Sequence, residues 1–101
     1  MTKADLVDTV ATGTGLTKLE TEAVLDGIIS TIAHALITGE HVELRGFGVF
    51  RSVKRAPKIA RNPKTNEEVP IPERMVPVFK PAVELRDRVN RNLKHKLSEP
   101  A

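Results

Sequence analysis

The first forty residues repeat apolar side chains with the spacing of an α-helix. A first helix is expected to begin at Thr2, because Asp5 follows three residues later in a pattern typical of a helix N-cap. Gly13 and Gly15 are expected to end it. Its apolar positions share one face: Leu6, Val7, Val10 and Ala11. The pattern therefore predicts a short helix with one buried side.

A second, longer helix is expected to begin after Thr17, which forms a capping box with Glu20, and to end at Gly39. About 20 residues at 1.5 Å each make it roughly 30 Å long. Its apolar positions cover more than half of its circumference: Ala23, Val24, Leu25, Ile28, Ile29, Ile32, Ala33, Leu36 and Ile37. One chain of this size cannot cover so wide an apolar arc. We therefore expect the same helix of a second copy to cover it, in an obligate dimer.

From residue 41 the apolar spacing changes to every second residue, which predicts β-strands. Val42 and Leu44 indicate a half-buried strand. Gly46-Phe47-Gly48 indicates a tight turn with one aromatic anchor, and a second strand is expected over residues 49–54 with Phe50 facing inward.

Residues 55–77 remain extended and have no convincing apolar face. They predict a two-stranded ribbon that reverses at residues 62–66, where a proline presets the first turn angle and an asparagine tolerates a left-handed backbone. Because such a ribbon has nothing to pack against, we expect it to be mobile until it binds a partner.

After the ribbon, Val78 and Phe79 are expected to return to the core, and Pro81 to occupy the first turn of a last helix. Several basic residues lie on or beyond this helix: Arg86, Arg88, Arg91, Lys94 and Lys96. They either complement the helix dipole or form a second nucleic-acid contact, and the sequence leaves both open. The end of the chain, residues 98–101, is expected to be frayed.

Charge is distributed unevenly, although the net charge is only +3. Residues 1–40 contain two basic and six acidic residues, a net charge of −4, whereas residues 51–80 contain eight basic and three acidic residues, a net charge of +5. Six of the seven prolines lie between positions 57 and 81, so the positive charge lies on backbone that is neither a central strand nor a helix interior. This pattern favours an acidic body with a polyanion-binding element over an ordinary solvated surface.

The sequence lacks the residues on which most catalytic and metal sites depend. It has no cysteine, and His34, His41 and His95 have no metal-ligand spacing. No phosphate loop or nucleophile motif is present. We therefore expect no enzyme activity, cofactor, metal or small-molecule substrate. No apolar run reaches membrane length, so we expect a cytoplasmic protein without a membrane partner. The ribbon has no aromatic residue on which single-stranded bases could stack, which favours duplex nucleic acid.

Three motifs occur in a fixed order: Arg45-Gly-Phe-Gly-Val-Phe50, Arg61-Asn-Pro-Lys-Thr65 and Val78-Phe-Lys-Pro81. With them the chain resembles the HU and integration host factor family of bacterial DNA-bending proteins. The resemblance covers residues 1–92 as a single DNA-binding domain with an arm at about 55–77. It implies an α+β intertwined dimer: two N-terminal helices, a short antiparallel sheet with a protruding basic β-ribbon arm, and a C-terminal helix. Residues 93–101 are expected to be a short basic tail, partly disordered.

The resemblance also implies how residues contact DNA. Pro63 corresponds to the arm-tip proline that wedges between base pairs and kinks the duplex, with Arg61 and Asn62 beside it in the minor groove. Further basic residues match arm and saddle positions that reach phosphates and groove edges: Lys54, Arg55, Lys58, Lys64, Arg74 and Lys80. Lys3 matches a body position that reaches backbone phosphate, with a surface ion pair as the alternative. Gly46 and Gly48 would let the saddle turn approach DNA closely.

Some motifs are closer to the beta subunit of integration host factor than to HU, namely Arg55-Ala-Pro57 and Glu84-Leu-Arg-Asp-Arg88. In that subunit an arginine at the position of Arg45, steadied by a glutamate at the position of Glu43, helps to select sites. An ordinary charge pair in a sheet is the alternative. The chain departs from the family at Ala60, Asn66 and Ala82, where glycine is usual.

These observations predict a homodimeric architectural protein that binds the minor groove of double-stranded DNA, bends it and helps to compact the nucleoid. A site-selective subunit of a heterodimer is the first alternative. A structured-RNA binder that uses the arm as a non-specific clamp is the second.

Overall fold

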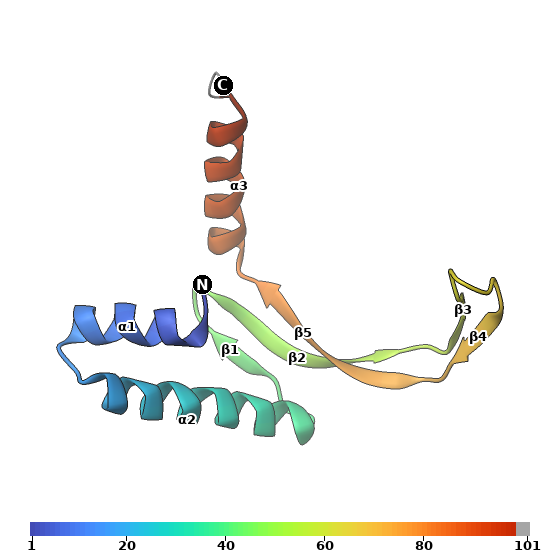
Figure 1. Cartoon of the computed structure of the whole chain (residues 1–101), viewed down its shortest axis with the longest axis horizontal. Coiled ribbons are helices and arrows are strands. Elements are labelled where there is room, and N and C mark those ends of the chain that lie inside the picture. Colours follow the sequence, from blue (N-terminus) through green and yellow to red (C-terminus); the bar gives the residue numbers. More distant parts are fainter. Residues whose placement is uncertain (99–101) are drawn as a thin grey trace. The chain divides into compact units, whose positions relative to one another are not determined.

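The computed structural model describes residues 1–98, which form three helices and five strands (Figure 1). In chain order these are α1 (Lys3–Thr14), α2 (Lys18–Ile37), β1 (Val42–Leu44), β2 (Gly48–Arg55), β3 (Lys58–Arg61), β4 (Glu68–Ile71), β5 (Arg74–Pro81) and α3 (Val83–Ser98). The expected α+β class and order of elements are confirmed. By its internal contacts the chain divides into two units, Met1–Ala35 and a second that begins at Leu36.

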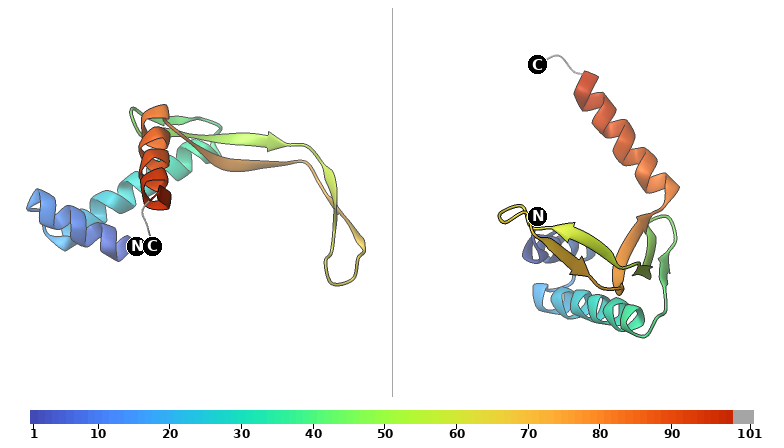
Figure 2. Two further views of the ribbon diagram at one scale, coloured as in Figure 1. Left: turned by 90° about the horizontal axis from the view of Figure 1, so that it is seen from above. Right: turned by 90° about the vertical axis from the view of Figure 1, so that its right-hand side faces the viewer.

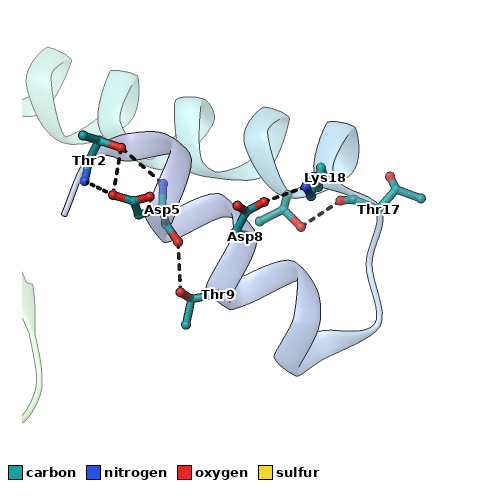
Figure 3. Close-up of polar contacts among 7 residues, drawn as sticks. Thr2, Asp5, Asp8, Thr9, Thr17 and Lys18 are labelled. Atoms are coloured by element: carbon teal, nitrogen blue, oxygen red, sulfur yellow. Dashed lines mark hydrogen bonds and ion pairs between the residues drawn. The ribbon is translucent and has the colours of Figure 1, made fainter.

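In the first unit, both helices begin at the expected caps. The Thr2 N–H donates to Asp5 Oδ2 at 2.8 Å, and the Asp5 N–H donates to Thr2 Oγ1 at 3.3 Å (Figure 3). The same reciprocal pair joins Thr17 to Glu20, with both distances 3.1 Å. Gly15 ends α1 with a φ of 77°, a left-handed conformation that favours glycine. These local polar signals fix the helix boundaries independently of packing.

The first unit buries very little of its apolar surface. Val7 and Ala11 are its buried apolar side chains, each 7% exposed, whereas Val24 and Ile28 on α2 are 57% and 50% exposed. An apolar cavity of about 190 Å³ opens beside these two α2 residues and is also lined by Leu6 on α1. Helices with so much uncovered apolar surface are not stable alone in water.

In the second unit, β1, β2 and β5 form a three-stranded antiparallel sheet in the order β1-β2-β5. Three phenylalanines pack where β2 meets β5, with ring centroids 5.1 Å apart for Phe47 and Phe79 and 4.8 Å apart for Phe50 and Phe79. Strands β2 and β5 run side by side over eight rungs and lead to β3 and β4, which pair with each other and form the far end of the ribbon (Figure 1).

Two boundaries near the C-terminus differ from expectation. Pro81 is not in a helix: it is the last residue of β5, opposite Gly48, and Ala82 donates its N–H to Phe47 O at 2.8 Å before α3 begins. Strand pairing, which is non-local, keeps Pro81 extended. Helix α3 then continues to Ser98, so residues 93–98 are helical and not a separate tail. No glycine or proline occurs between Pro81 and Pro100, so nothing in the sequence interrupts this helix. Of the end that was expected to be frayed, residues 98–101, Ser98 is the last residue of α3, and residues 99–101 lie outside the described residues. No helix within residues 1–98 is long and apolar enough to cross a lipid bilayer.

Candidate nucleic-acid interface

The ribbon made by β2 and β5 has two chemically different faces. Residues directly opposite each other in an antiparallel pair lie on one face, and successive residues alternate between faces. One face carries four basic side chains among valines: Arg51, Arg55, Arg74 and Lys80. The other carries the Phe50–Phe79 pair, Ser52 opposite Pro77, and Lys54 opposite Met75. The register therefore separates a basic face from an aromatic face.

Arg51 was not among the residues that the resemblance matched to DNA contacts. It is exposed and lies on the basic face, four residues before Arg55. Its signal was present, because Phe50 facing inward requires residues 51, 53 and 55 to face outward. Lys54, which was expected to contact DNA, lies on the aromatic face instead, and its Nζ is 3.1 Å from Glu73 Oε1.

The arm tip is a turn held by hydrogen bonds between its two sides. The Asn62 N–H donates to Glu67 O at 2.9 Å, and Asn62 Oδ1 accepts from the Lys64 N–H at 2.9 Å. The Asn66 N–H donates to Asn62 O at 2.7 Å, and Asn66 adopts a φ of 62°. Asparagine tolerates this left-handed conformation better than most residues, which explains how the turn forms without glycine. Pro63 lies exposed within this turn.

Arg61 is exposed, but its guanidinium group is bonded to other residues of the arm. Its Nη1 donates to Asn66 O at 3.2 Å, and its Nη2 lies 3.7 Å from Glu68 Oε1 on the opposite strand. Lys58 and Lys64 are exposed, and neither forms one of the ion pairs found within the part of the chain that the structure describes. The two lysines are therefore available to a polyanion, whereas Arg61 must exchange a partner to bind one.

Lys3 is held by two carboxylates of α2. Its Nζ lies 2.6 Å from Asp26 Oδ1 and 3.6 Å from Glu22 Oε1. The hydrogen bond to Asp26, reinforced by the negative charges of both carboxylates, raises the pKa of Lys3 above its ordinary value. This is the surface ion pair that the sequence offered as the alternative, and a phosphate would have to displace Asp26 to bind Lys3.

The turn between β1 and β2 contains Arg45, Gly46 and Gly48. Arg45 is exposed, and none of the ion pairs found among residues 1–98 joins it to Glu43. Gly46 has a φ of 81°, which favours glycine. Glycine is required at position 48 by close packing, because a Cβ there would lie 2.5 Å from the Phe79 ring and 2.6 Å from Lys80 O. Among the described residues, no group of three or more histidine or acidic side chains could hold a metal ion.

Comparison with known proteins agrees with this geometry. Residues 1–90 match the sequence model of a family described as bacterial DNA-binding protein. Integration host factor subunit beta of Stutzerimonas stutzeri is 45% identical over 91 residues, which cover 89% of this chain and 98% of that protein. The corresponding subunit of Pseudomonas aeruginosa strain LESB58 is 44% identical over 91 residues, covering 89% and 97%.

Solved structures are similar in fold. The HU protein in an Anabaena HU–DNA cocrystal matches with a TM-score of 0.82 and 43% identity, covering 88% of this chain and 97% of that one. HU from Thermotoga maritima matches with a TM-score of 0.62 and 35% identity, covering 88% and 98%. The chain therefore belongs to the bacterial DNA-binding protein family of HU and integration host factor, nucleoid-associated architectural proteins that bind double-stranded DNA and form dimers.

Proposed function

We propose that two copies of this chain form a homodimer whose arms enter the minor groove of duplex DNA, where Pro63 wedges between base pairs and bends the duplex. The protein would help to compact the nucleoid in the bacterial cytoplasm, without a cofactor, a metal, a small-molecule substrate, a membrane partner or catalytic activity. One observation carries the proposal: an exposed proline is held by a hydrogen-bonded turn at the far end of a ribbon with a basic face.

The proposed contacts follow the charge along the ribbon. Groove edges and phosphates beside Pro63 are contacted by Lys58 and Lys64. Arg61 and Asn62 join them after giving up their partners within the turn. The basic face of the β2–β5 ribbon contacts phosphates closer to the body: Arg51, Arg55, Arg74 and Lys80. Gly46 lets the β1–β2 turn approach DNA beside Arg45, and Lys3 adds a phosphate contact when Asp26 releases it. Lys54 is left out, because it lies on the aromatic face.

A heterodimer is the second candidate, and a specific observation favours it. The relatives at 44–45% identity are named as the beta subunit of integration host factor. A subunit of this kind would pair with a different chain and select sites, with Arg45 as the candidate reader. Refolding the purified chain alone and measuring its mass and its DNA binding separates the two candidates, because a homodimer needs no second chain.

Replacement of Pro63 by alanine tests whether the arms bend DNA or only bind it. Pro63→Ala removes the wedge but no charge, so bending of a straight duplex should fall strongly and affinity moderately, while pre-kinked or nicked duplex is bound almost as well as before. The salt dependence of binding should stay near that of the parent. The matched control is Pro70→Ala, which removes a proline from β4 on the same arm, away from the tip.

The assay is energy transfer between the ends of a labelled duplex at saturating protein, with RNA of equal length as a competitor. If Pro63→Ala bends the duplex as sharply as the parent, Pro63 is only a turn residue. Preference for RNA over duplex DNA would contradict the proposed DNA function itself.

A further inference from the structure

The ribbon is interrupted where the arm leaves the sheet. We call this place the neck; it consists of Arg55–Pro57 and Pro72–Arg74. Arg55 is opposite Arg74 on one side of it, and Lys58 is opposite Ile71 on the other. The unchanged register carries Pro57 opposite Pro72, and two facing prolines offer no N–H to either strand. The strand pairing is therefore interrupted here, and Figure 2 shows that the ribbon changes direction beyond β2 and β5.

The last rung before this break joins two like charges. Arg55 and Arg74 are direct cross-strand partners, an arrangement that destabilises a ribbon. The neighbouring carboxylate, Glu73, faces the other side with Lys54, so it does not neutralise them. Arg74 Nη1 is buried and has no hydrogen-bond partner among the residues that the structure describes. A buried donor without a partner is unfavourable, so an acceptor that reaches this nitrogen would stabilise the rung.

We infer that Arg55 and Arg74 form a two-pronged site for one phosphate group, and that closure on this phosphate stiffens the neck. Two guanidinium groups on one face match the oxygens of a phosphate, which accepts charge-assisted hydrogen bonds from both. The bound anion bridges Arg55 and Arg74, so the two like charges no longer destabilise the pair. The neck is then bendable when empty and firm when occupied. Where the phosphate belongs to DNA, this inference rests on the proposed function.

The surroundings favour a phosphate that belongs to a polymer backbone. The same face continues toward the sheet with Arg51 and Lys80, so further phosphates would meet further cations. No aromatic side chain lies on this face between Gly48 and Arg55 or between Arg74 and Pro81, so a nucleobase would find nothing on which to stack. Inorganic phosphate has the same chemistry and serves as the probe for the isolated group.

Amide hydrogen exchange at the neck of the full-length protein tests the inference. It is measured in chloride, in inorganic phosphate at the same pH and ionic strength, and with a saturating duplex. Arg74→Gln removes one of the two charges, and Arg55→Gln tests the same rung should Arg74→Gln fail to fold. Arg51→Gln removes a charge from the same face four residues away; it is the control for neck exchange, not for DNA binding.

In the parent, phosphate and duplex should both slow exchange at the neck. In Arg74→Gln or Arg55→Gln, exchange in chloride should already be slower than in the parent by a factor of about two to five, and phosphate should slow it no further. Arg51→Gln should respond to phosphate like the parent. A parent neck that ignores phosphate and duplex overturns the inference, and so does loss of the response in Arg51→Gln.

The same samples separate this inference from the proposed function. If the parent bends duplex DNA while its neck ignores phosphate, the function stands and the phosphate site does not. If the neck responds to phosphate while duplex DNA is not bent, the site stands and the bending function does not. A neck that responds to inorganic phosphate but not to duplex contradicts a backbone phosphate as its occupant.

Discussion

Dilution should unfold this protein, because the apolar surface that one chain leaves exposed is covered only by a second copy. In the first unit only Val7 and Ala11 are buried apolar residues, while Val24, Ile28 and Ile29 on α2 are half exposed. A monomer with this surface has no core of useful size. Folding and association are then one equilibrium, and the unfolding midpoint rises with protein concentration.

The size of the effect follows from the length of the chain. Two chains of 101 residues, at about 0.7 kcal/mol per residue, give an unfolding enthalpy of roughly 140 kcal/mol near 60 °C. Each tenfold increase in concentration adds about 1.4 kcal/mol to the stability of the dimer. Together these values shift the midpoint by about 3–4 °C per tenfold change in concentration.

Circular dichroism from 1 to 100 μM, a range chosen to span two decades, should therefore show a rise of about 7 °C. The mass in solution should be that of a dimer wherever the helices are folded. A midpoint that stays constant over this range, together with a folded monomer, would refute the reasoning.

Three further predictions concern the arm and the body. Lys58→Ala should lower the slope of log affinity against log salt by roughly one to two per dimer, measured by titration of a fixed duplex, and an unchanged slope would move phosphate binding off the arm. Asp26→Asn should weaken the hold on Lys3, which Glu22 still contacts, and raise affinity for long duplexes at low salt by up to about fivefold, whereas unchanged affinity would indicate that Lys3 does not reach DNA. Asn66→Ala should destabilise the arm turn by about 1–2 kcal/mol while Asn66→Gly preserves it, as read from exchange of the Asn62 and Asn66 amides; equal behaviour of the two variants would contradict the role of the left-handed backbone.

The Lys3–Asp26 pair also has a defined pH range. The pKa of Lys3 is raised in the folded protein, so the pair's contribution to stability is fully present at neutral pH, which lies below the pKa of Lys3 in the unfolded chain. The contribution is lost only as the pH rises through the raised pKa. Neutralising Asp26, not changing the pH near neutrality, is therefore the practical way to weaken the hold on Lys3.

Local signals in the sequence were sufficient for the helix starts but not for every boundary. The capping boxes at Thr2 and Thr17 depend on residues three positions apart, so the sequence predicts them directly. Pro81 was assigned to a helix because proline suits a first turn, yet pairing with Gly48 keeps it in β5. That pairing joins residues 33 positions apart, and no local pattern contains it.

The candidate site shows the same distinction. The positions of Pro63 and of the turn around it follow from turn chemistry and are as expected. The basic residues, in contrast, were taken from positions that match the family's arm and saddle, which included Lys54 and omitted Arg51. Strand register decides between them, because it places one on the aromatic face and the other beside Arg55. Counting charges thus locates the arm, while alternation along β2 separates its basic face from its aromatic face.

The three positions at which the chain lacks the usual family glycine make different demands on the backbone. Among the described residues other than glycine, Asn66 alone has a positive φ, so Ala60 and Ala82 occupy ordinary conformations. Ala60 pairs with Val69 in the arm, and Ala82 donates to Phe47 O before α3. At Asn66, asparagine has fewer unfolded conformations to lose than glycine and keeps the turn closed. Asn66 therefore favours the closed turn around Pro63, so that less of the free energy of the proposed DNA binding would be spent on ordering this turn.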